Sequence, residues 1–368
     1  MDTIPRRAVL KTAAAIPFAA VAGCTTAFGD DDEPPAYHGG LPHDGANDEP
    51  GVFLVHIDTA WLREFDDDTE LPYEDQLPDA VDTDRDPDTA PVDVDPLIAY
   101  PFSGFFIGVF GVAFGLIPYG FGDRLLSSLD EDDGVEGQPV DDAESTADDG
   151  ATDDDGSAHG DVRVDSILLV DGVAVFGGSF DERAIVAASD GFEPAGERGE
   201  FDVYEGTEEG VFGTEGLAFA VRDDTLVVLL DPESDLEAVV DAVSDSTDRL
   251  SDDDDGDWAL RTAGHGHMTL GAWGTDPDDA IEDGEPGVED DGFVDVERVL
   301  DDADGFISSL TFGLEEAGAT LAAAFPEGET PEADAFEEEI GTSATTREID
   351  VDGTRVSVTG AWRASDDE

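Results

Sequence analysis

The chain has 368 residues, of which 94 are Asp or Glu and 16 are Lys or Arg, and its formal charge is −78. Such an acidic surface repels phosphates and argues against nucleic acid as a partner. High net charge is also typical of disordered chains, but 39% of the residues are hydrophobic and cluster in strand-like runs, which predicts a packed core. The length suggests about two domains. The single cysteine, Cys24, allows no disulfide within the chain.

Residues 5–24, PRRAVLKTAAAIPFAAVAGC, have the order of an export signal. The pair Arg6 and Arg7 precedes an apolar stretch, 12–22, that is too short to span a bilayer. Small residues then lead to Cys24. These features resemble those of lipoproteins exported by the twin-arginine route. The resemblance implies cleavage before Cys24, a lipid on its sulfur, and anchoring at the outer face of the cell membrane. It covers only these residues and implies nothing about the body.

Lysine usage indicates the environment in which the protein folds. Lys11 is the only lysine, and every other basic residue is an arginine. Removal of residues 1–23 takes away a net charge of +2 and leaves −80. This composition resembles that of proteins from halophilic archaea. Near 1 M salt the Debye length is about 3 Å, so separated carboxylates hardly repel one another. We therefore expect a protein that folds in molar salt.

Turn residues and hydrophobic periodicity divide the body into segments. Residues 24–50 predict a flexible acidic tether, and 130–160 and 275–291 predict solvated acidic loops. Two halves are expected, 51–250 and 257–363. The predicted strands are 53–58, 166–170, 173–177, 201–205, 217–221, 225–230, 268–273, 307–312, 319–325, 346–351 and 354–362. The predicted helices are 181–189, 234–243, 294–300 and 330–340.

Both halves have the same predicted order of strand, crossover, hairpin, helix and a further strand or hairpin. This order predicts an α+β fold of two similar halves, each with a mainly antiparallel sheet and the ferredoxin-like β-α-β-β-α-β order. The similarity lies in element order, not in aligned identities. A single irregular α+β domain is the alternative. The body resembles no family of known activity.

The first crossover contains an apolar insertion, 97–122, which has 26 residues and no charge. As a helix it would be about 39 Å long, more than the ~30 Å hydrocarbon core of a bilayer. Pro101 and Pro118 interrupt it, and few basic residues flank it. One helical face would carry a glycine stripe and the phenylalanines would fill the others: Gly104, Gly108, Gly111, Gly115, Phe105, Phe106, Phe110 and Phe114. A buried core helix or hairpin is the leading interpretation. A membrane-dipping or self-association element and a spanning helix are the alternatives.

One histidine pair and one His–Asp pair are the candidate metal ligands. His265 and His267 share a face at the start of a predicted strand, so both imidazoles could meet one metal ion. The sequence specifies no third ligand, and a structural pair is the leading interpretation. His56 and Asp58 share a face of the first predicted strand, and a core histidine is again the leading interpretation.

Two acidic runs, 82–86 and 252–255, resemble parts of a calcium-binding loop. Pro87 stands where the first run needs a glycine, and the second run lacks an acid at its first position. In a chain with 94 acidic residues, such runs arise from composition alone. We predict no calcium site at either run.

No nucleophile-and-base arrangement, phosphate-binding glycine loop or dinucleotide fingerprint is present in the sequence. The sequence therefore predicts no catalytic residue and no cofactor. The favoured interpretation is a non-enzymatic envelope or interaction module that meets the membrane through a lipid on Cys24. One alternative is an extracytoplasmic metal-binding protein or hydrolase that uses His265 and His267. Another is a membrane-embedded or self-associating protein that acts through 97–122.

Overall fold

The computed structural model describes residues 35–46, 51–61, 95–130, 162–207, 214–274, 297–300, 302–313 and 316–363. Several sequence-based predictions lie outside these residues. They are the export signal with Arg6 and Arg7, the lipidation site Cys24, the acidic run 82–86, the loop 275–291 and all but the first residue of the loop 130–160.

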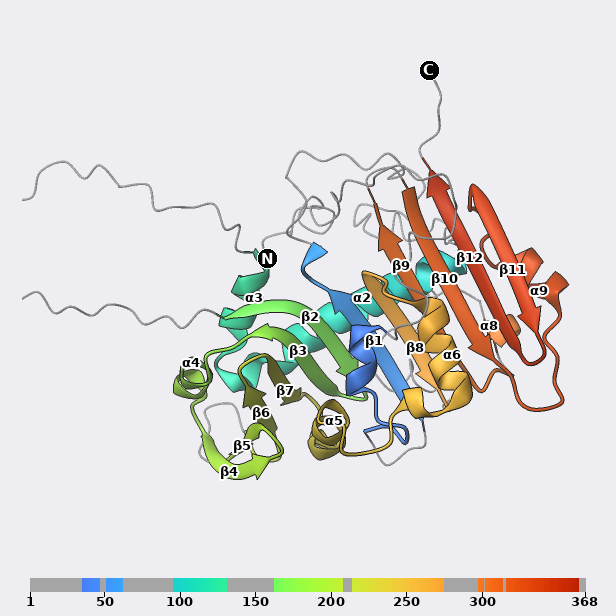
Figure 1. Ribbon diagram of the computed structural model, residues 1–368. Coiled ribbons are helices and arrows are strands. Elements are labelled where there is room, and N and C mark those ends of the chain that lie inside the picture. The colour runs from blue at the N-terminus through green and yellow to red at the C-terminus, as the bar shows by residue number, and fades with distance from the viewer. Residues whose placement is uncertain are drawn as a thin grey trace, which may run out of the picture.

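Twelve antiparallel strands form one continuous sheet in the order β11-β12-β10-β9-β8-β1-β2-β3-β7-β6-β5-β4 (Figure 1). The strands are β1 (Val52–Asp58), β2 (Arg163–Val170), β3 (Val173–Ser179), β4 (Phe192–Arg198), β5 (Phe201–Gly206), β6 (Ala218–Arg222), β7 (Thr225–Leu229), β8 (Met268–Trp273), β9 (Gly305–Phe312), β10 (Glu316–Ala324), β11 (Thr346–Asp352) and β12 (Arg355–Arg363). The helices are η1 (Ala36–Gly40), α2 (Pro96–Gly115), η4 (Ile117–Tyr119), α3 (Gly122–Asp130), α4 (Glu182–Ala188), α5 (Leu236–Val243), η5 (Leu250–Asp252), α6 (Asp254–Ala263), α8 (Glu297–Leu300) and α9 (Ala333–Glu339). The predicted α+β class with an antiparallel sheet is confirmed.

The sheet does not have the ferredoxin-like order. That order places another strand between the two strands that the first crossover joins. Here β1 pairs directly with β2, and Val55 lies opposite Leu169. On its other side β1 pairs with β8, where Val55 lies opposite Leu270. The strands of the two predicted halves thus belong to a single sheet, joined through β1 and β8.

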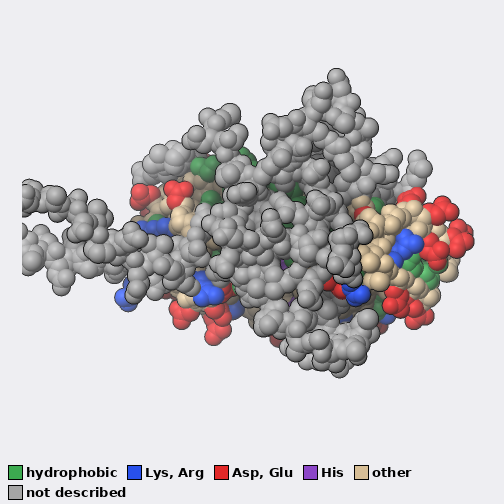
Figure 2. Space-filling view, turned by 90° about the horizontal axis from the view of Figure 1, so that it is seen from above, with side chains coloured by type: hydrophobic (Ala, Val, Ile, Leu, Met, Phe, Trp, Pro, Cys, Tyr) green, Lys and Arg blue, Asp and Glu red, His purple; other side chains and the backbone are tan. Residues whose placement is uncertain are grey.

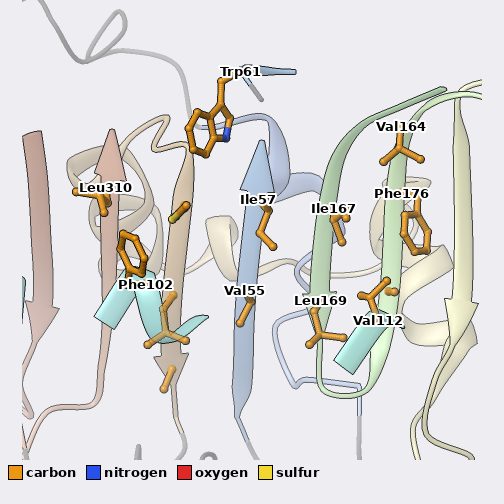
Figure 3. Close-up of a cluster of buried hydrophobic side chains, with 14 of the residues drawn as sticks. Val55, Ile57, Trp61, Phe102, Val112, Val164, Ile167, Leu169, Phe176 and Leu310 are labelled. Carbon is orange, nitrogen blue, oxygen red and sulfur yellow. The ribbon is translucent and has the colours of Figure 1, made fainter. Parts of the chain in front are cut away.

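Helices cover both faces of the sheet (Figure 1). Side chains alternate between the faces along each strand, so Val55 joins one core and Leu54 joins the other. The first core lies under α2, α3, α4, α8 and α9, and the second lies under η1, α5 and α6. In Figure 3, Phe102 of α2 is drawn near Leu310 of β9 and Val112 near Leu169 of β2, all within the first core.

Part of the predicted tether belongs to the folded body. Tyr37, Leu41 and Ala46 are buried in the second core. The backbone N–H of Leu250 donates to the carbonyl of Leu41 at 3.1 Å. Residues 35–46 therefore pack against the body, and their burial corrects the expectation of a flexible segment there.

Several local features differ from the sequence-based prediction. α3, β4 and α6 were not predicted. The acidic run 252–255 lies at the start of α6, where the carboxylate of Asp253 accepts N–H groups of the first helical turn. α9 begins at Ala333 after Glu332, later than the expected start at Thr330.

Candidate functional site

The N-terminus of α2 is fixed by one buried carboxylate. Asp95 caps the helix by accepting the N–H of Leu97 at 3.1 Å. The same carboxylate accepts the N–H groups of Gly341 and Ser343 at 2.8 Å each, and the Ser343 hydroxyl at 2.8 Å. Asp95 therefore ties the start of α2 to the loop between α9 and β11.

Gly104 and Gly108 of α2 face the sheet. A Cβ on Gly104 would lie 3.0 Å from Leu270, and one on Gly108 would lie 3.0 Å from Val55. Both glycines are buried. Gly111 differs, because it is exposed and a Cβ there would have its nearest neighbour at 3.9 Å. The close approach of helix and sheet at Gly104 and Gly108 makes this face of the apolar segment part of the core, as the leading interpretation expected.

The outer face of α2 carries large apolar side chains in water. Among the described residues, the exposed large hydrophobic side chains are Phe110, Phe114 and Ile117, with exposed fractions of 49%, 70% and 54%. Phe110 and Phe114 are four residues apart on one face of α2, and Ile117 lies in η4, which follows α2. The ring of Phe110 stacks on Phe106 at 6.4 Å and on Phe114 at 6.5 Å. We call Phe106, Phe110, Phe114 and Ile117 the aromatic stripe.

Among the described residues, one helical segment is long enough and apolar enough to cross a bilayer by length and composition, and it runs from Pro96 to Tyr119. In its most apolar window, 44% of the residues are buried inside the protein. The segment is helical through Pro101, where an interruption was expected. One face of the helix lies in the core, as expected of a core helix. The other face lies in solvent, as expected of a membrane-dipping or self-association element.

The structure places His56 in the second core, next to Tyr37. The two rings stack at 4.6 Å. Burial lowers the pKa of His56 to about 3, with smaller contributions from the nearby rings of His265 and His267. His56 is therefore neutral at neutral pH. Its Nδ1 atom has no hydrogen-bond partner among the described residues.

His267 belongs to an aromatic stack with Trp61 and Phe312. Its ring lies parallel to that of Trp61 at 4.9 Å. Its Nδ1 atom accepts the backbone N–H of Phe312 at 3.1 Å, and burial lowers its pKa to about 4. His265 is exposed. Within the part of the chain that the structure describes, no group of three or more His, Cys, Asp or Glu side chains is placed to hold a metal ion.

A row of buried polar side chains that sequence reasoning missed continues from His56 across the sheet. Its members lie opposite one another on successive strands: Thr269, Ser309 and Thr320. The hydroxyl of Ser309 donates to the carbonyl of Ala263 in α6 at 2.5 Å. This hydrogen bond links β9 to α6, and only the strand register could have revealed the row.

The described surface is acidic where it is visible. Figure 2 shows Asp and Glu side chains gathered at both ends of the molecule, with a few basic side chains among them. Some arginines are held in ion pairs, such as Arg198 with Asp241 at 2.7 Å and Arg355 with Asp255 at 2.6 Å. The uncharged face of α2 contrasts with this acidic surface.

No protein-family model matches the chain, and no curated protein matches it. Solved structures of TP0453 are similar at a low level. Crystal form III has 10% sequence identity and a TM-score of 0.37, with 90% of this chain and 94% of that chain covered. Crystal form IV has 11% identity and a TM-score of 0.38, with 90% and 93% covered.

Proposed function

We propose that the protein is an exported, lipid-anchored, non-enzymatic interaction module of a haloarchaeal cell envelope, and that the aromatic stripe of α2 is its contact surface. The exposure of Phe110, Phe114 and Ile117 carries this proposal. A contiguous apolar patch on an otherwise charged protein marks a site of interaction with another surface. Exposure of these side chains to water is unfavourable, so a partner that covers them stabilises the bound state.

The anchor is supported by the order of features in residues 5–24. Arg6 and Arg7, a short apolar stretch and small residues before Cys24 occur in the order that lipoprotein export requires. Two lipid chains hold a protein stably where one chain is marginal. The interaction surface would then act at the outer face of the membrane.

Cell fractionation tests this proposal. Cys24→Ala combined with Phe110→Ser and Phe114→Ser removes both the lipid site and the contact surface, and should leave export intact but move the protein to the soluble fraction after membranes are washed in molar salt. The two serine substitutions alone should leave the protein on washed membranes through Cys24. Arg6→Lys combined with Arg7→Lys should keep the precursor in the cytosol. Normal export of the double lysine variant would overturn the twin-arginine assignment. Release of the protein by the two serine substitutions alone would overturn the anchor.

A further inference from the structure

We propose that the aromatic stripe inserts into the lipid surface to which the protein is anchored, so that α2 lies along the bilayer interface. This inference rests on the proposed function and names its partner. The proposal has three requirements. The stripe must be able to reach the lipid, its side chains must suit lipid, and the axis of α2 must lie parallel to the bilayer surface.

The chain outside the described body is short on the anchored side. Ten residues lie between Cys24 and Pro35, where the described body begins, so eleven residue-to-residue steps join the two. Fully extended, eleven steps reach roughly 36–40 Å. Twelve strands at about 4.8 Å each make a sheet roughly 55 Å wide. The anchor therefore holds the body within less than its own width of the bilayer. Because η1 follows Pro35 on the face opposite α2, the linker has to pass an edge of the sheet for the stripe to meet the lipid.

The chemistry of the stripe suits acyl chains. The side chains of Phe106, Phe110, Phe114 and Ile117 carry no hydrogen-bond donor or acceptor, and α2 has no charged residue along its whole length. Interfaces between proteins combine an apolar centre with a polar rim and several direct hydrogen bonds. Lipid acyl chains offer no hydrogen bonds and need none.

The exposed area is too small for a stable dimer. A phenylalanine presents about 200 Å², so Phe110 and Phe114 together expose roughly 240 Å². With Ile117 the stripe exposes a few hundred Å², whereas a stable interface buries about 800 Å² on each partner. Shallow insertion into lipid needs no such area, because binding grows with the apolar surface buried and no shape match is required.

The packing of α2 sets the orientation. Gly104 and Gly108 hold the helix against Leu270 and Val55. The helix axis therefore stays along the sheet, and only its outer face can enter lipid. The result is a helix that lies in the interface and does not span the bilayer.

Single-cysteine labelling tests the contact directly, because Cys24→Ala removes the only cysteine of the chain. In this background, Phe114→Cys would carry an environment-sensitive fluorophore on the stripe. Thr247→Cys would carry it at an exposed position after α5, a helix that covers the opposite face. Phosphatidylcholine vesicles in molar NaCl should shift the emission to the blue at position 114 and leave it unchanged at 247. Equal shifts at both positions, or none at 114, would overturn the proposal, as would a shift at 114 that depends on protein concentration without vesicles.

Vesicle flotation provides the second measurement. Unlabelled Cys24→Ala protein should float with phosphatidylcholine vesicles, and adding Phe110→Ser with Phe114→Ser should weaken binding by about tenfold or more. Gly111→Ser is the matched control, because it changes an exposed position beside the stripe and should bind like the parent. Circular dichroism checks that each variant is folded. Equal flotation of all variants would overturn the proposal.

The two proposals fail in different ways. If Cys24→Ala never binds vesicles while Phe110→Ser with Phe114→Ser stays on washed cell membranes, the stripe proposal is wrong and the anchor stands. If Cys24→Ala floats with vesicles while Phe110→Ser with Phe114→Ser leaves washed cell membranes, the anchor is wrong and the stripe holds the protein.

Discussion

Asp95 joins two distant parts of the chain at one point. Its buried carboxylate accepts three backbone N–H groups and one hydroxyl. Asp95→Ala leaves these donors without their acceptor and should lower the free energy of unfolding by about 3 kcal/mol. Asp235→Ala is the matched control, since Asp235 caps α5 at the surface and its loss should cost about 1 kcal/mol. Denaturant titrations in molar salt measure both. Equal losses would contradict the bridging role of Asp95.

His56 makes stability depend on pH. Burial lowers its folded pKa to about 3, whereas an unfolded histidine titrates near about 6.5. The unfolded chain therefore takes up the proton first. The stability that His56 contributes is complete above about pH 6.5 and is lost as the pH falls toward about 3.

The variant His56→Leu removes this titration. In molar salt, its melting temperature should fall less steeply than that of the wild type between about pH 7 and about pH 5. His43→Gln is the control, because it replaces a histidine at the surface beside Asp44. A wild-type slope in His56→Leu would contradict the role of this residue.

At the scale of one element, the glycines of α2 are not equivalent. Gly108 is buried against Val55 and Ile57, so Gly108→Leu should overpack the contact and cost about 1–3 kcal/mol. Gly111→Leu adds its side chain in solvent and should leave the melting temperature nearly unchanged. Thermal melts of Gly108→Leu and Gly111→Leu, each made in the Cys24→Ala background, measure the difference. Equal destabilisation would mean that Gly111 also faces the core.

The elements that were predicted well from the sequence contain short-range sequence patterns, such as turn residues. The Asp171–Gly172 turn between β2 and β3 is one, since both residues have positive φ, as a two-residue hairpin turn requires. β4 escaped prediction because it is an exposed edge strand with Pro194 and without regular alternation. α6 escaped because its capping acids lie within an acidic run, which looks the same as a solvated loop.

The candidate site was predictable only in part. The spacing of the glycines and phenylalanines shows that α2 has different faces, but not which face meets the sheet. The proximity of His56 to His267 depends on the pairing of β1 with β8, a register that no local pattern encodes. Both features are set by long-range contacts.

At the scale of the whole molecule, charge makes the fold depend on salt. The Debye length grows from about 3 Å at 1 M salt to about 10 Å at 0.1 M, so dilution couples carboxylates across the surface. The mature chain would carry −80, and no disulfide within the chain can oppose the repulsion. Circular dichroism at neutral pH should show cooperative loss of structure as salt falls, with recovery at acidic pH. An unchanged signal in dilute buffer would contradict the halophilic interpretation.

The central position of β1 has a consequence for the order of folding. Its partner residues on β8 lie more than 200 positions away, as with Val55 and Leu270, and those on β2 lie more than 100 away. Loop closure over such distances makes folding slow, and the centre of the sheet cannot close until synthesis has passed residue 273. A chain that ends at residue 263 would leave one edge of β1 open to other molecules. Such a chain should sediment as aggregate in molar salt, while one that ends at residue 363 should remain soluble. Folding of this protein is therefore completed late, after most of the chain has been made.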